Sequence, residues 1–270
     1  MAKRPGQGAH DRKTVALPAT DASGVGAHHQ VELHQPVPEL PGPLQRVLAE
    51  PAARNTAPCV GWAASIVARR DPAAVLAVLP ADHHILEEER YQAVFVSAVQ
   101  AARGGHLVTV GIKPTRPETG YGYIELGDEL APGVFVASRF VEKPDLERAS
   151  RFVEEGRFLW NSGMFFWRLD VFLSEMARVA PGHALVIDRL VPLLREGMVA
   201  EAERVFAELP DISIDYLLME RADNVQVVEA AFEWDDVGTW DAFARYMGGD
   251  ARGNSSLGDN VLVQTADCLV

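Results

Sequence analysis

Hydrophobic positions in the middle of the chain alternate between two periods. Helical spacing predicts helices over residues 58–70 and 87–103. Short continuous apolar runs predict strands buried on both faces at 74–79 and 106–112. A strand, a helix and a second strand at this spacing form a βαβ unit, which implies parallel strands joined by a right-handed crossover.

The rest of the chain extends the same α/β alternation. Further strands are expected at 121–126, 134–141, 164–167, 225–229 and 260–263. Further helices are expected at 145–155, 169–179, 183–196, 199–208 and 213–221. The pattern therefore predicts an α/β fold, with a mixed, mostly parallel sheet and flanking helices.

The ends of the chain differ from this central part. Residues 1–43 are rich in Pro, Gly and His and keep neither period, so we expect a disordered or atypical segment. Residues 44–250 carry the α/β pattern as one domain. We expect 251–270 to begin a truncated C-terminal region, because the chain ends on an apolar stretch without a polar tail.

Composition narrows the function classes. The formal net charge of −13 argues against a nucleic-acid partner, whose phosphates would need Lys and Arg, but allows a nucleotide that arrives as its magnesium complex. The longest apolar run, 73–79, is far shorter than the ~20 residues of a membrane span, and no secretory signal opens the chain. Two distant cysteines fit a reducing compartment. These features predict a cytoplasmic protein without a membrane partner.

Two acidic residues stand in turns at the ends of apolar runs. Asp82 follows the run 74–79 directly, and Asp236 lies in Trp234-Asp235-Asp236-Val237. Mg²⁺ needs hard oxygen ligands and usually takes one or two protein carboxylates, with water and substrate phosphates in its other positions. The pair predicts a magnesium site, although Asp82 taken alone is more typical of a turn or helix-cap residue, and the choice between Asp235 and Asp236 stays open.

Several short segments resemble one family when taken in order. They are Arg54-Asn55-Thr56-Ala57-Pro58, Leu79-Pro80-Ala81-Asp82-His83, Pro117-Glu118-Thr119-Gly120-Tyr121-Gly122-Tyr123-Ile124, Phe140-Val141-Glu142-Lys143-Pro144, Trp160-Asn161-Ser162-Gly163-Met164-Phe165, Ser213-Ile214-Asp215-Tyr216 and Asp236-Val237-Gly238-Thr239-Trp240. Together, over about residues 46–262, they resemble the mannose-1-phosphate guanylyltransferases among the sugar-nucleotide pyrophosphorylases. The resemblance implies a Rossmann-like nucleotide-diphospho-sugar transferase fold. It also implies transfer between GTP and α-D-mannose 1-phosphate that gives GDP-mannose and diphosphate.

The resemblance also assigns roles to residues. It implies that Asp82 and Asp236 hold Mg²⁺ and that Lys143 joins them as a catalytic residue, since a compact cation suits a sugar phosphate. Glu142 can accept hydrogen bonds from sugar hydroxyls, and the Asn161 amide can both donate and accept. The plainer alternatives are a surface ion pair for Lys143 and a turn residue for Asn161.

The same resemblance extends the substrate-binding set to four more residues. Gly120 lets the backbone approach a ligand closely, and Tyr121 beside it is included with it. Asn55 and Thr56 are expected near the nucleobase, although they can equally cap the helix predicted from residue 58.

The chain departs from the family at one point. The pyrophosphorylases open with a strand and a loop of the type Gly-Gly-x-Gly-Thr-Arg-Leu-x-Pro, which wraps the triphosphate, and residues 1–45 contain no match. We therefore expect a domain incomplete at both ends. Three functional alternatives stay open: the family enzyme, with full or impaired activity, a catalytically inactive sugar-nucleotide-binding regulatory subunit, and a non-functional fragment. The oligomeric state is not fixed, and a homo-oligomer is compatible with the sequence.

Overall fold

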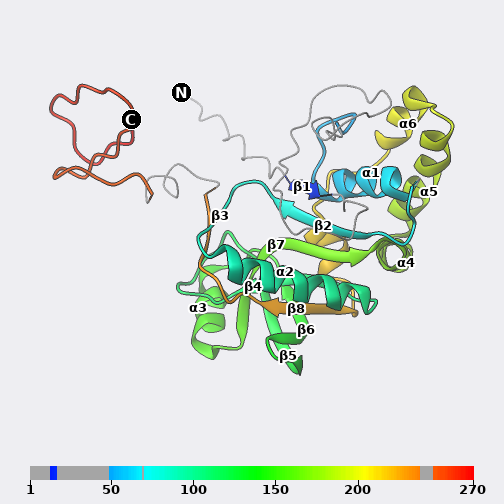
Figure 1. Ribbon diagram of the computed structural model, residues 1–270, viewed down its shortest axis with the longest axis horizontal. Coiled ribbons are helices and arrows are strands. Elements are labelled where there is room, and N and C mark those ends of the chain that lie inside the picture. Colours follow the sequence, from blue (N-terminus) through cyan, green and yellow to red (C-terminus); the bar gives the residue numbers. More distant parts are fainter. Residues whose placement is uncertain (1–12, 17–48, 69, 238–245) are drawn as a thin grey trace.

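The computed structural model describes residues 13–16, 49–68, 70–237 and 246–270. Within these residues, one mixed sheet lies between two helical layers (Figure 1). Its strands are β1 (Lys13–Ala16), β2 (Val75–Pro80), β4 (Leu107–Ile112), β5 (Tyr123–Ala131), β6 (Val134–Val141), β7 (Phe158–Arg168) and β8 (Val225–Glu229). The helices are α1 (Thr56–Ala68), α2 (Glu88–Arg103), α3 (Leu146–Glu155), α4 (Leu169–Val179), α5 (Pro181–Arg195), α6 (Val199–Phe206) and the π-helical turn η1 (Asp215–Met219).

The order of the strands corrects one expectation. The sheet runs β1-β2-β7-β4-β8-β6-β5, and among its described strands only the neighbours β4 and β8 are parallel. The strands β2 and β4, which flank α2, do point the same way, but β7 lies between them and is antiparallel to both. The α/β fold with a mixed sheet is confirmed, whereas the expectation of a mostly parallel sheet is wrong.

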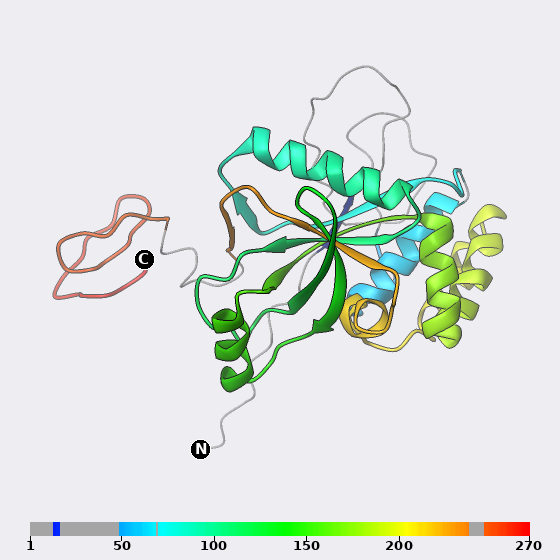
Figure 2. The ribbon, with the colours of Figure 1, turned by 90° about the horizontal axis from the view of Figure 1, so that it is seen from below.

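Strand β7 divides the hydrophobic core into two halves because its side chains alternate between the faces of the sheet. Phe165 and Trp167 pack on the face covered by α1, α4 and α5. Phe166 and Met164 pack on the opposite face, beneath α2 and α3. Figure 2 shows α2 along one face of the sheet and α1 with α4 to α6 on the other. This double cover explains why the part of β7 from Met164 to Trp167 is continuously apolar.

Local sequence signals set the ends of α3. The Asp145 carboxylate accepts from the Arg148 backbone N–H at 2.8 Å, which satisfies one of the first free donors of the helix. Gly156 ends α3 in the left-handed conformation (φ 68°), which glycine adopts without steric cost. The chain then enters β7 and returns to the sheet.

A second, two-stranded sheet lies beside the main one. Strand β3 (His83–Ile85) pairs antiparallel with β9 (Trp234–Asp236), so that His83 faces Asp236 and His84 faces Asp235. The Val237 N–H also donates to the Asp82 carbonyl oxygen at 3.0 Å. This small sheet joins two segments that lie far apart in the sequence.

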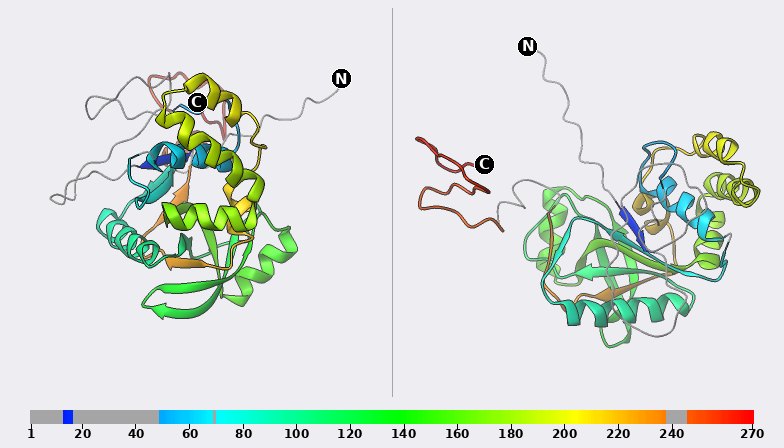
Figure 3. Two further views of the ribbon diagram at one scale, coloured as in Figure 1. Left: turned by 90° about the vertical axis from the view of Figure 1, so that its right-hand side faces the viewer. Right: turned by 45° about the horizontal axis from the view of Figure 1, so that its top comes forward.

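The ends of the chain meet the expectations only in part. Strand β1 pairs antiparallel with β2 inside the segment for which we expected no regular structure, and the rest of 1–43 lies outside the described residues. The strand expected at 260–263 is wrong: residues 246–270 form turns and two isolated bridges, Gly249 with Ser255 and Ser255 with Leu269. The right-hand view of Figure 3 shows this C-terminal stretch apart from the main sheet and its helices. In the described part of the chain, every helix is too short or too polar to cross a membrane.

Candidate active site

A polar cavity of about 190 Å³ opens at the carboxyl end of β2. Seven of the residues that the sequence predicted for the site line it: Asp82, Gly120, Tyr121, Glu142, Lys143, Asn161 and Asp236. They come from separate segments of the chain, so the fold brings distant motifs to one place. The carboxyl edge of strands is where α/β sheets bind their ligands.

The small sheet decides which of the two adjacent aspartates faces the cavity. Side chains alternate along a strand, so the paired His83 and Asp236 share one face, and both line the cavity with Asp82. Asp235 lines a neighbouring cavity of about 430 Å³, and its Oδ2 accepts from the Tyr246 hydroxyl at 2.8 Å. The choice that the sequence left open falls on Asp236.

The donor set at this edge suits a hard cation that keeps open positions. No group of three or more His, Cys, Asp and Glu side chains able to hold a metal occurs in the ranges that the structure describes. Asp82 and Asp236 nevertheless line one cavity, and the Val237–Asp82 backbone hydrogen bond links their segments. Two carboxylates on a polar cavity fit Mg²⁺, which commonly takes one or two carboxylates and completes its shell with water and phosphate oxygens.

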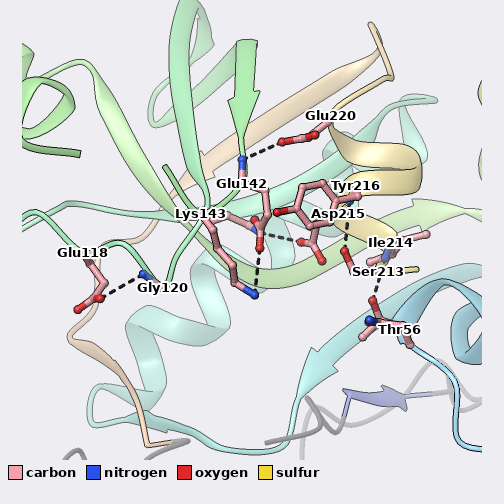
Figure 4. Close-up of polar contacts among 12 residues, drawn as sticks. Thr56, Glu118, Gly120, Glu142, Lys143, Ser213, Ile214, Asp215, Tyr216 and Glu220 are labelled. Carbon is pink, nitrogen blue, oxygen red and sulfur yellow. Dashed lines mark hydrogen bonds and ion pairs between the residues drawn. The ribbon is translucent and has the colours of Figure 1, made fainter. Parts of the chain in front are cut away.

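Lys143 stands in a strained backbone conformation at the end of β6. Its φ is 45°, in the left-handed region that non-glycine residues rarely adopt, and its ammonium lies 3.7 Å from Glu142 Oε1. The backbone N–H of Glu142 donates to Glu220 Oε1 at 2.8 Å, which fixes the turn from the other side (Figure 4). Strain of this kind persists where the surroundings over-determine it, and it concentrates at functional sites.

Gly122 makes room for the Glu142 carboxylate. A Cβ atom at position 122 would lie 2.5 Å from Glu142 Oε2 and 3.3 Å from Asn161 Cβ. Nearby, the Gly120 N–H donates to Glu118 Oε1 at 3.2 Å (Figure 4). A larger residue at position 122 would therefore displace the Glu142 carboxylate from its present position.

The amide of Asn161 is largely engaged by the protein. Its Oδ1 accepts from the Thr109 hydroxyl at 3.0 Å and from the Gly163 N–H at 3.1 Å. Its Nδ2 donates to Asp215 Oδ1 at 2.9 Å. An amide oxygen has two lone pairs, so Asn161 offers the cavity an N–H donor and no remaining acceptor.

The sequence assigned no role to Asp215, although its segment supported the resemblance. Asp215 opens η1 and lines the cavity while only 7% exposed. Figure 4 shows it beside Glu142 and Lys143. A signal was available in the sequence, since an acidic residue in an otherwise apolar helical stretch is unusual when buried.

Asn55 and Thr56 do not line this cavity. Asn55 Oδ1 accepts from the Thr56 backbone N–H at 2.8 Å, at the start of α1. Thr56 is buried, and its hydroxyl oxygen accepts from the Ile214 N–H at 2.8 Å (Figure 4). Thr56 thus anchors the residue that precedes Asp215, and a contact of these two residues with a nucleobase stays a prediction.

Aromatic side chains separate the two cavities. Tyr121 and Trp234 line both, and Tyr121 packs edge-on against Trp160 at 5.3 Å and against Trp234 at 5.6 Å. Burial, followed by the nearby negative charge of Asp236, raises the pKa of Tyr121 to about 12. Tyr121 therefore stays a neutral hydroxyl at every physiological pH.

The site combines two carboxylates suited to a cation, a lysine suited to a phosphate and carboxylates suited to hydroxyls. On the edge of a mixed α/β sheet with helices on both faces, such a set suits a phosphorylated sugar or a nucleotide. The sequence profile of the family described as "Nucleotidyl transferase" matches residues 28–252, and the chain belongs to this family.

Within this family, the chain is similar to proteins named mannose-1-phosphate guanylyltransferase. The chain is 42% identical over 238 residues to a protein of Sinorhizobium fredii named mannose-1-phosphate guanylyltransferase, covering 86% of this chain and 46% of that one. It is 38% identical over 235 residues to a Vibrio cholerae protein named putative mannose-1-phosphate guanylyltransferase, covering 85% of this chain and 50% of that one. The chain thus spans about half the length of these relatives.

A solved structure supports the fold. The crystal structure of a protein from Thermus thermophilus, described as mannose-1-phosphate geranyltransferase, matches with a TM-score of 0.69 and 38% sequence identity. The match covers 79% of this chain and 61% of that chain. The resemblance found in the seven sequence segments is confirmed at the level of family and fold.

Proposed function

We propose that this chain is a nucleotidyltransferase domain that joins GTP to α-D-mannose 1-phosphate and gives GDP-mannose and diphosphate. The observation that carries the proposal is the convergence of Asp82, Asp236, Glu142 and Lys143 on one cavity. The names of the similar proteins support the choice of substrates.

The proposed reaction needs no covalent bond between the protein and its substrates. A phosphate oxygen of mannose 1-phosphate attacks the α-phosphorus of GTP, and the bond from that phosphorus to the bridging oxygen of pyrophosphate breaks. Catalysis of such a transfer is mostly positioning and neutralisation of charge. The Lys143 ammonium suits the phosphate of the sugar, and Glu142 suits its hydroxyls.

Magnesium is the proposed cofactor of this reaction. Asp82 and Asp236 would hold it, and the ion would neutralise charge on the phosphates of the nucleotide. The acidic character of the cavity supports this assignment, because a polyanionic ligand beside two carboxylates needs a cation between them.

Pyrophosphate release tests the proposal. The purified chain is incubated with GTP, mannose 1-phosphate and Mg²⁺, beside an Asp82→Ala, Asp236→Ala double variant whose folding is checked by circular dichroism. We expect turnover by the parent chain and its loss in the variant. A folded parent chain that binds GDP-mannose but releases no pyrophosphate would support the inactive regulatory alternative, and one that neither turns over nor binds would contradict the proposal.

A further inference from the structure

The cavity has two carboxylates at the end that holds Lys143. Glu142 and Asp215 both line it with Lys143, whose ammonium lies 3.7 Å from Glu142 Oε1 (Figure 4). The pKa of the neighbouring Tyr216 is raised by burial and further by the negative charges of Glu142, Glu220 and Asp215, while Lys143 lowers it. Carboxylates therefore outnumber the ammonium at this end.

Asp215 is held firmly in its position. Asn161 Nδ2 donates to Asp215 Oδ1 at 2.9 Å from β7. The residue before it is anchored by the Ile214–Thr56 hydrogen bond, and the Asp215 carbonyl oxygen accepts from the Glu220 N–H at 2.9 Å inside the π-helical turn. Single π turns are rare and frequently occur at functional sites.

The hydrogen bonds of Asn161 mean that another residue must accept a hydrogen bond from a ligand hydroxyl at this wall of the cavity. Because its amide oxygen already accepts from Thr109 and Gly163, Asn161 has no acceptor left for a ligand hydroxyl. A sugar hydroxyl that donates at this wall of the cavity needs an ionised carboxylate or a carbonyl oxygen. The buried carboxylate that the Asn161 amide orients is Asp215.

We propose that Asp215 accepts a hydrogen bond from one hydroxyl of the sugar and so determines which sugar 1-phosphate or nucleotide sugar binds, with Asn161 as its positioning residue. This inference rests on the proposed function and adds a specificity residue to it. Asp215 accepts a hydrogen bond from a sugar hydroxyl, whereas Lys143 binds the phosphate. The probes are GDP-mannose and its analogues that lack one hydroxyl at C2, C3, C4 or C6.

The test compares binding ratios by isothermal titration calorimetry of the full chain with Mg²⁺. In the parent chain, loss of the hydroxyl that Asp215 contacts should weaken binding about tenfold or more, because the hydrogen bond is made to a charged group. In Asp215→Ala, the ratio of the dissociation constants of that analogue and of GDP-mannose should fall to about one. The ratios for the other analogues should stay as in the parent chain. Asp188→Asn, at an exposed position on α5, is the matched control and should keep the binding ratios of the parent chain.

Asn161→Ala separates positioning from general stability. If Asn161 acts through Asp215, this variant should lose the same single discrimination, while a structural role would lower the affinity for every analogue equally. Asp215→Asn keeps the size of the side chain and serves where Asp215→Ala does not fold. Unchanged discrimination in folded Asp215 variants would overturn the inference and leave the proposed function standing. A parent chain that binds none of the probes would contradict the proposed function itself.

Discussion

Asp236 faces His83 in register across the two-stranded sheet of β3 and β9, and both side chains line the cavity that contains Asp82. The register has a chemical consequence, because a strand places its neighbouring residue on the other face. Asp235, one position earlier, therefore lines the other cavity and is bonded by Tyr246. One carboxylate of the adjacent pair faces the proposed cation site, and the other faces away from it.

This relationship predicts different effects for two neighbouring substitutions. Asp236→Asn should weaken Mn²⁺ binding in the presence of GDP-mannose by about 10–100-fold or more, because substitution of partners beyond the direct ligands already costs about that much metal affinity. Asp235→Asn should change it little. Electron paramagnetic resonance of Mn²⁺ titrations gives the free ion directly. Equal losses in the two variants would contradict the assignment of faces.

The contact of Gly122 with Glu142 predicts a loss of binding without a loss of charge. Gly122→Ala would place a methyl group 2.5 Å from Glu142 Oε2, so the carboxylate must move. We expect weaker binding of GDP-mannose by roughly tenfold or more and a free energy of unfolding lower by about 1–3 kcal/mol. Gly182→Ala is the control, since a Cβ there meets nothing within 4 Å. Unchanged binding in Gly122→Ala would argue against a role for Glu142.

The strained backbone of Lys143 predicts that one substitution can raise the stability of the protein while it weakens substrate binding. Lys143→Gly relieves the positive φ and should raise the free energy of unfolding by on the order of 0.5 kcal/mol, because glycine adopts this region freely but loses more entropy on folding. Lys143→Ala keeps the strain and should not stabilise. Both variants should bind mannose 1-phosphate more weakly, which calorimetry and chemical denaturation measure on the same samples. Retained affinity in both variants would remove Lys143 from the site.

Glu50 predicts a pH dependence of stability that is separate from the site. Burial raises its pKa from 4.5 to about 7, and its Oε2 has no hydrogen-bond partner among the described residues. The folded state holds this proton more tightly than the unfolded state, so the contribution is fully present below about pH 4.5 and is lost as the pH rises to about 7. As the pH rises through this range, the free energy of unfolding of Glu50→Gln should therefore increase relative to that of the parent chain. Above this range, the difference between the two should be constant. Urea unfolding at several pH values measures the difference, and a flat difference from about pH 4 to 8 would contradict the shift.

The helices and many strands could be predicted from the sequence because their hydrophobic periods are strong. The bounds of β6 and β8 agree with the expected ranges, and α2 begins one residue later than expected. Strand β7 was expected only at 164–167, since the polar group Asn161-Ser162-Gly163 interrupts its apolar run. The neighbours of β7 in the sheet could not be predicted, because pairing depends on contacts distant in the sequence.

The candidate site was predictable where a motif carried its own chemistry. Asp82, Glu142 and Lys143 each follow a strand, and the structure places them on one cavity. An acidic residue in an apolar stretch was a local signal for Asp215, but its partner Asn161 lies 54 residues away, so its place on the cavity could not be predicted. The face of Asp236 likewise depends on its pairing with β3.

Titration of GDP-mannose into the full chain, with and without Mg²⁺, tests the central claim most directly. The claim is that the cavity lined by Asp82, Asp236, Glu142 and Lys143 is a magnesium-dependent site for a nucleotide sugar. The account predicts binding that requires Mg²⁺ and is abolished in the folded Asp82→Ala, Asp236→Ala variant. Equal affinity with and without Mg²⁺, or full affinity in that variant, would contradict it.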